Sequence, residues 1–174
     1  MTTLADVRAA AALIEGVAAR TPVQLSHALS HLVGRPVWFK CENLQRAGSF
    51  KIRGAYTRLA RLSQEQRAHG VVAASAGNHA QGVALAARTL GIDATVYMPV
   101  DAALPKLAAT RDYGATVELS GATLDEAVVQ ARAHAERTGA EFVHPYDHED
   151  VVAGQGTVGL EILEQVPDVA TIVV

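Results

Sequence analysis

Lys51 is the residue whose type and setting point most directly to chemistry. It lies between Phe50 and Ile52, in the segment from Ser49 to Ala55 that reads SFKIRGA. Apolar surroundings lower the pKa of a lysine by desolvation, and the neutral amine is a nucleophile that can form a Schiff base with a carbonyl group. The alternative is a surface lysine whose alkyl chain covers apolar neighbours while its ammonium stays in water. Residue type alone leaves both interpretations open.

A second candidate is the segment Ser75-Ala-Gly-Asn-His79, which follows an apolar run directly. The turn from Ala73 to Gly77 resembles a nucleophile elbow, although the first glycine of that motif is missing and His79 lies only one helical turn after Ser75. Ser75 as an ordinary helix N-cap is the second interpretation. In the third, Ser75, Asn78 and His79 bind a phosphate or carboxylate at a helix N-terminus. Asn78 and His79 are weak helix formers, so helix propensity does not explain them.

The segment from Gly154 to Gly159 matches the pattern G-x-G-x-x-G of dinucleotide-binding turns. That motif follows a strand directly and has an acidic residue about 20 positions further on. Here the acidic residues Asp147 and Asp150 come before the glycines instead. We therefore expect a glycine-rich helix start that packs tightly against a neighbouring element.

Four residues near position 147 have the types that bind metals, namely His144, Asp147, His148 and Asp150. They lie across a predicted strand end and loop, where polar residues are common, and no helical spacing fixes a third ligand. The sequence therefore predicts no metal site.

Strands and helices that alternate along the chain must position these residues. We predict helices at 9–19, 25–33, 49–62 and 63–70, a strand at 36–41 and a polar loop at 42–48. Further on, we predict strands at 71–74, 94–98, 116–119, 141–144 and 170–174, and helices at 77–90, 104–113, 123–137 and 151–166. Gly91, Gly114 and Gly139 lie where left-handed helix ends are expected. Such alternation predicts an α/β fold of right-handed βαβ units, with a parallel sheet covered on both faces.

Composition limits the classes of protein that fit. The 174 residues are 49% hydrophobic and 19% charged, which excludes disorder, and a net charge of −3 without a basic stripe excludes a nucleic-acid partner. Cys41 is the only cysteine, so neither a disulfide framework nor a cysteine zinc site is possible. The first residues lack the pattern of a signal peptide, and no apolar run reaches the length of a membrane span. We expect a cytoplasmic protein without a membrane partner.

Three motifs together resemble the threonine dehydratase branch of the fold-type II pyridoxal-phosphate enzymes. They are FKCENLQRAGSFKIRGA from Phe39 to Ala55, SAGNHAQG from Ser75 to Gly82, and AGQGT from Ala153 to Thr157. Their order and spacing match the family, and the resemblance covers essentially the whole chain. It implies the three-layer, parallel-sheet architecture of the tryptophan synthase β-like class, in truncated form. It also implies that the glycines after position 153 begin a helix of that fold.

The resemblance implies roles for five residues. Lys51 would hold pyridoxal 5'-phosphate as a Schiff base and remove the Cα proton, Phe50 would pack on the pyridine ring, and Asn78 would bond its phenolic oxygen. Ser75, Asn78 and His79 would surround the substrate carboxylate. The implied reaction is β-elimination from L-threonine or L-serine, which gives 2-oxobutanoate or pyruvate and ammonia, in isoleucine biosynthesis or threonine catabolism. The complete enzyme would be a homo-oligomer.

The family layout implies a partial large domain at residues 1–69 and 148–174, and a smaller mobile domain at 70–147. The strand expected at 170–174 would precede the glycine-rich loop that binds the cofactor phosphate in the family. We therefore expect the 174 residues alone to be inactive.

Two other functions stay open. The racemase branch of the same fold has a second serine after the one that matches Ser75, whereas this sequence has Ala76, which favours elimination. A non-catalytic, truncated fragment that binds a partner subunit through an incomplete sheet edge is the other alternative.

Overall fold

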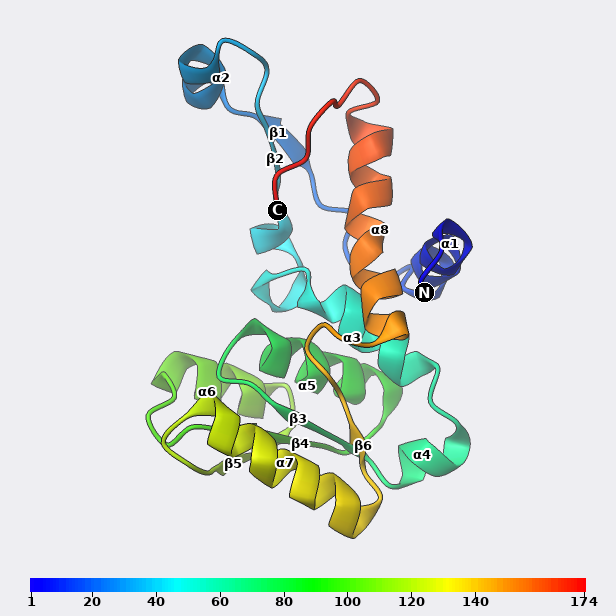
Figure 1. The fold of residues 1–174 in the computed structure, drawn as a ribbon, viewed down its shortest axis with the longest axis vertical. Helices are drawn as coiled ribbons and strands as arrows, with labels where there is room; N and C mark the ends of the chain where they lie inside the picture. Colours follow the sequence, from blue (N-terminus) through cyan, green and yellow to red (C-terminus); the bar gives the residue numbers. More distant parts are fainter.

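The computed structural model describes all residues from Met1 to Val174, and its largest sheet is parallel (Figure 1). The strands lie in the order β5-β4-β3-β6, and each pair runs parallel. They are β3 (Val71–Ala74), β4 (Ala94–Met98), β5 (Thr116–Leu119) and β6 (Glu141–Phe142). The α/β class and the parallel sheet are therefore confirmed, although β6 ends two residues earlier than predicted.

Helices cover both faces of this sheet. Successive side chains of a strand point to opposite faces, and those of β3 are apolar on both. Val71 and Ala73 face α5 (Asn78–Leu90) and α6 (Leu104–Asp112), while Val72 and Ala74 face α7 (Leu124–Thr138). Every residue of β3 is buried, as expected for a central strand with helices on both sides. Figure 1 shows α5 and α7 on opposite faces of the sheet.

Local signals fix many of the helix ends. Thr123 accepts a hydrogen bond from Glu126 N and caps α7, and Ser63 forms a capping box at α4 (Gln64–Ala68). Gly91, Gly114 and Gly139 all have positive φ, which confirms the predicted helix ends.

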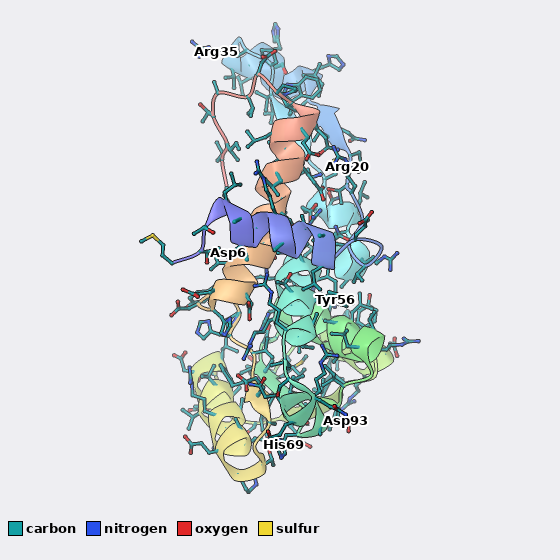
Figure 2. All side chains as sticks on the ribbon, turned by 90° about the vertical axis from the view of Figure 1, so that its right-hand side faces the viewer. Asp6, Arg20, Arg35, Tyr56, His69 and Asp93 are labelled. Atoms are coloured by element: carbon teal, nitrogen blue, oxygen red, sulfur yellow. The ribbon has the colours of Figure 1, made fainter.

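Two helices cross on the outer side of α5. α3 (Lys51–Ala60) packs against α5 and contributes Ile52, Ala55 and Leu59 to the same apolar core. α8 (Glu149–Gln165) crosses α3 so closely that a Cβ atom on Gly154 would lie 2.6 Å from Arg53 O. α1 (Leu4–Leu13) packs against α8, and Figure 2 shows it across the side of the molecule.

A short arm extends away from these helices. β1 (Val23–Leu25) pairs antiparallel with β2 (Trp38–Lys40), and α2 (His27–Val33) lies between them in sequence. Ser26 caps α2, and Gly34 ends it with φ 71°. Arg35 lies at the far end of the arm, opposite His69 and Asp93 (Figure 2). The antiparallel pair was not predicted, because the three residues of β1 are too few to show a pattern. The polar loop at 42–48 forms two short 3-10 turns, Glu42–Leu44 and Arg46–Gly48.

Three predictions about the elements were wrong. The first helix spans Leu4–Leu13 instead of 9–19, because a Thr3 and Asp6 capping box starts it earlier and Gly16 turns the chain at φ 75°. Residues 170–174 form no strand, and Val173 is 92% exposed, because no neighbouring strand pairs with them. The segment from Gly154 to Gly159 lies inside α8 and not at its start.

None of the helices combines the length and the apolar character that crossing a bilayer requires.

Candidate functional site

Lys51 begins α3. Its backbone packs against α5 at Gly82, where an added Cβ atom would lie 3.0 Å from Lys51 C. The Nζ atom donates a hydrogen bond to Pro145 O at 3.0 Å and lies 5.2 Å from the centre of the Phe50 ring. Ser49 Oγ accepts from Lys51 N at 3.4 Å. The start of α3, α5 and the segment at Pro145 therefore meet at Lys51.

The lysine is half-buried, and burial lowers the pKa of its amine. No carboxylate forms an ion pair with it, so its hydrogen-bond acceptor is a neutral carbonyl. A desolvated amine without a counter-ion deprotonates more readily and is a better nucleophile than a surface lysine.

The turn from Ser75 to Asn78 leads from β3 into α5. Ser75 Oγ accepts from Gly77 N at 3.1 Å, and Gly77 is the N-cap residue without a side-chain cap. The interpretation of Ser75 as N-cap of α5 is therefore wrong, although its hydroxyl stabilises the turn. No side chain occupies the first N–H groups of α5, so they remain available to an anion.

Asn78 is exposed at the start of α5, and its Oδ1 accepts from Lys106 Nζ at 2.8 Å. Because the carbonyl side of the amide is bound to an ammonium, the two Nδ2 hydrogens remain for another acceptor. Lys106 was missed in the sequence analysis, since nothing local links α6 to Asn78.

His79, in contrast, points inward. Its side chain is buried, with 5% of the residue exposed, and Nε2 lies 3.0 Å from Val143 O. The pKa of His79 is lowered to about 4, mainly by burial; the bond to Val143 opposes this shift, and the charges of Lys51 and His144 add to it. The ring is therefore neutral at pH 7 and donates from Nε2. Ser75 and Asn78 therefore lie at the turn between β3 and α5, whereas Lys51 and His79 both bond to carbonyls of the segment from Val143 to Pro145.

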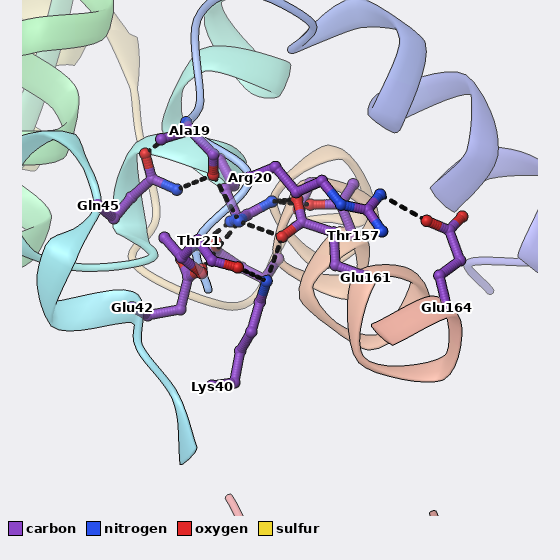
Figure 3. A network of polar contacts seen from close by, with 12 residues as sticks. Ala19, Arg20, Thr21, Lys40, Glu42, Gln45, Thr157, Glu161 and Glu164 are labelled. Atoms are coloured by element: carbon purple, nitrogen blue, oxygen red, sulfur yellow. Dashed lines mark hydrogen bonds and ion pairs between the residues drawn. The ribbon is translucent and has the colours of Figure 1, made fainter. Parts of the chain in front are cut away.

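A buried ionic network holds α3, the helix that carries Lys51 (Figure 3). Arg53 has no exposed side-chain surface and pairs with Glu42 at 2.8 Å and Glu161 at 2.7 Å. It also donates to Ala19 O and Thr157 Oγ1, each at 3.1 Å. Burial raises the pKa of Glu161, but hydrogen bonds from Arg53 and Lys40 outweigh it and lower the pKa overall. The network joins α3 and α8 to Ala19 before β1, to Lys40 in β2 and to Glu42 after β2.

The four residues with metal-ligand types serve the turn before α8. His144 Nδ1 accepts from Asp147 N at 2.8 Å, and His148 Nδ1 accepts from Asp150 N at 3.1 Å. Asp150 also pairs with Arg61 at 2.5 Å. No group of three or more His, Cys, Asp or Glu side chains has the arrangement of a metal site.

The comparisons with known proteins agree with this geometry. The family model described as "Pyridoxal-phosphate dependent enzyme" matches residues 14–174. An L-threonine ammonia-lyase of Thermotoga maritima is 53% identical over the whole chain, which covers 43% of that protein. A threonine deaminase structure from Solanum lycopersicum is 42% identical at a TM-score of 0.91, over 95% of this chain and 45% of that one.

The maize serine racemase structure is 41% identical at a TM-score of 0.93, over 96% of this chain and 51% of that one. The chain thus spans about half the length of the proteins that it matches. Since the family model covers all but the first 13 residues, the chain belongs to the family of pyridoxal-phosphate-dependent enzymes.

Proposed function

We propose that this chain is the lysine-bearing part of an L-threonine and L-serine ammonia-lyase, which releases 2-oxobutanoate or pyruvate and ammonia. The observation that carries the proposal is the half-buried Lys51 amine, which has no carboxylate partner and donates to the Pro145 carbonyl, on a backbone that packs against α5 at Gly82. Similarity to an L-threonine ammonia-lyase and a threonine deaminase supports the substrate class.

The residues present fit pyridoxal 5'-phosphate. Lys51 would carry it covalently, because the pKa of its amine is lowered by burial. Phe50 lies beside the amine with 38% of its surface exposed and would pack on the pyridine ring. The free Nδ2 hydrogens of Asn78 would bond the phenolic oxygen. Bound there, the cofactor supplies an electron sink for the charge that develops at the substrate Cα.

The substrate carboxylate would bind at the N-terminus of α5. Ser75 and Asn78 lie there, and the unoccupied N–H groups and the helix dipole stabilise an anion. Fixing the carboxylate orients the Cα–H bond for proton removal. His79 was predicted to contact the same carboxylate, but its buried ring supports a position behind the site.

Lys51 would also act as the base. After the substrate amine displaces it from the cofactor, the neutral Lys51 amine would take the Cα proton and pass it to the hydroxyl group as the Cβ–O bond breaks, so that water leaves. The enamine that is released then hydrolyses to the 2-oxo acid and ammonia. Desolvation of the amine favours this role, because it brings the pKa of the base closer to neutral pH.

Borohydride reduction in the presence of pyridoxal phosphate, followed by peptide mapping, tests the proposal. We expect the pyridoxyl group on Lys51. A label on Lys40 or Lys106 in place of Lys51 would overturn the assignment of the cofactor lysine.

Serine racemisation is the second candidate, because the maize serine racemase superimposes on almost the whole chain. Ala76 favours elimination, since the serine that supplies a proton on the face opposite the lysine in racemases is missing at this position.

We further propose the division of the chain into a small domain at 70–147 and a large domain that includes 1–69 and 148–174. The four-stranded sheet with α5, α6 and α7 lies within the first of these ranges, which supports the division. The complete enzyme is proposed to be a cytoplasmic homo-oligomer of isoleucine biosynthesis or threonine catabolism. The buried free thiol of Cys41 is compatible with a reducing compartment.

A further inference from the structure

The segment between β6 and α8 is held by hydrogen bonds where it leaves the sheet. Val143 N donates to Val72 O at 2.8 Å, which continues the ladder of β3 and β6. The Val143 carbonyl accepts from the buried His79 ring at 3.0 Å. Two residues further on, the Pro145 carbonyl accepts from Lys51 Nζ at 3.0 Å.

His79 is the side chain that satisfies the Val143 carbonyl. Val143 has no exposed surface, so without His79 its carbonyl would lose a buried hydrogen bond. The segment could then recover a partner only by shifting or by admitting water. Pro145 has a fixed φ, so a shift at Val143 is carried to the carbonyl that holds Lys51.

We propose that His79 is a positioning residue, which holds the segment from Val143 to Pro145 so that the Pro145 carbonyl receives the Lys51 amine. On this view His79 acts behind the site and contacts no substrate. That the position of the Pro145 carbonyl matters for the reaction rests on the proposed role of Lys51. Whether His79 holds this carbonyl in place can be measured without cofactor.

Two variants of His79 separate the hydrogen bond from the volume of the side chain. His79→Gln keeps an N–H donor at nearly the place of Nε2, whereas His79→Met has a similar shape without a donor. His69→Met, at an exposed histidine, is the control for loss of an imidazole. Circular dichroism checks that each variant is folded.

The first measurement is the nuclear Overhauser contact between the Lys51 ε-protons and the backbone of Pro145 and Tyr146 in the cofactor-free chain. We expect the contact in the parent chain, in His79→Gln and in His69→Met, and its loss in His79→Met. Retention in His79→Met, or equal loss in His79→Gln, would overturn the proposal. Should His79→Met fail to fold, His79→Asn replaces it, since its donor is too short to reach Val143. Loss of the contact there supports the proposal, and retention contradicts it.

The second measurement is the ratio of pyridoxyl label on Lys51 to that on Lys106 after borohydride reduction. We expect His79→Met to lower this ratio about tenfold, the effect of one buried hydrogen bond, and His79→Gln to stay close to the parent. An unchanged ratio in His79→Met would count against the positioning role. If the parent chain itself shows no label on Lys51, the proposed function fails, while the nuclear Overhauser contact still decides the role of His79.

Discussion

Burial acts on Lys51 and His79 in the same direction, with different chemical consequences. Both side chains are cationic when protonated, and burial lowers the pKa of each. For Lys51 the result is a more nucleophilic amine with a carbonyl acceptor at 3.0 Å. For His79, whose pKa is about 4, the result is a ring that is neutral at pH 7 and serves as a fixed hydrogen-bond donor. The same physical effect therefore supports the reactive role proposed for Lys51 and the positioning role proposed for His79.

At the residue scale, the proposed function makes Ala76 the residue that sets the balance between elimination and racemisation. In an active full-length enzyme that contains this sequence, Ala76→Ser should raise racemisation of serine relative to pyruvate formation. The reason is that a hydroxyl there would supply a proton to the face opposite Lys51, and general acid catalysis is typically worth ~100- to 10,000-fold. Chiral chromatography of the products measures the ratio. An unchanged ratio with the cofactor still bound would contradict the role given to this position.

At the scale of the elements, the crossing of α3 and α8 depends on two glycines that lack room for a side chain. A Cβ atom on Gly154 would lie 2.6 Å from Arg53 O and from Gly54 Cα, and one on Gly54 would lie 2.9 Å from Val151 O. Backbone atoms cannot move aside as flexible side chains can. Helix packing therefore explains Gly154, as expected for tight packing of this segment, and the close approach fixes the position of α3, which begins at Lys51.

Two substitutions in α8 test this explanation. Gly154→Ala should lower the free energy of unfolding by roughly 1–3 kcal/mol, because overpacking forces the helices apart. Gly159→Ala is the matched control, since nothing lies within 4 Å of the added Cβ atom, and alanine should raise the free energy by about 0.5–1 kcal/mol in a helix. Urea unfolding followed by circular dichroism measures both. Equal effects of the two substitutions would exclude a packing role for Gly154.

At the scale of the whole molecule, the Arg53 network connects parts of the chain that are far apart in sequence (Figure 3). Glu161 lies 108 residues after its partner Arg53, and Lys40 joins the same carboxylate from 121 residues away. Removing one member of a buried ion pair leaves an uncompensated charge, which typically costs about 3–5 kcal/mol. The network therefore contributes to the stability of the fold mainly by keeping each charge partnered.

The lowered pKa of Glu161 predicts how stability changes with pH. The carboxylate contributes stability above its ordinary pKa of 4.5, and this contribution is lost as the pH falls through 4.5 toward the lower folded value. Glu161→Gln should be less stable than the parent at pH 7 but lose less stability between about pH 5 and pH 3. Urea unfolding at several pH values measures this. Glu164→Gln, at an exposed ion pair with Arg20, is the control and should keep the pH dependence of the parent. If the stability of Glu161→Gln changed with pH as that of the parent does, the Glu161 carboxylate would not be the source of this pH dependence.

The sequence by itself determined the alternation of strands and helices, most helix ends and the family, and it supplied the proposal of Lys51 as the cofactor lysine. Each of these depends on short-range patterns such as the Ser63 capping box, the left-handed glycines and the motif around Lys51. Only the tertiary structure decided that His79 turns inward to Val143, 64 residues away, and that Pro145 receives Lys51 from 94 residues away. It also decided that Arg53 is buried between two glutamates and that residues 170–174 form no strand. Local patterns report the preferences of the backbone, whereas burial and hydrogen-bond partners depend on which distant segments the fold brings together.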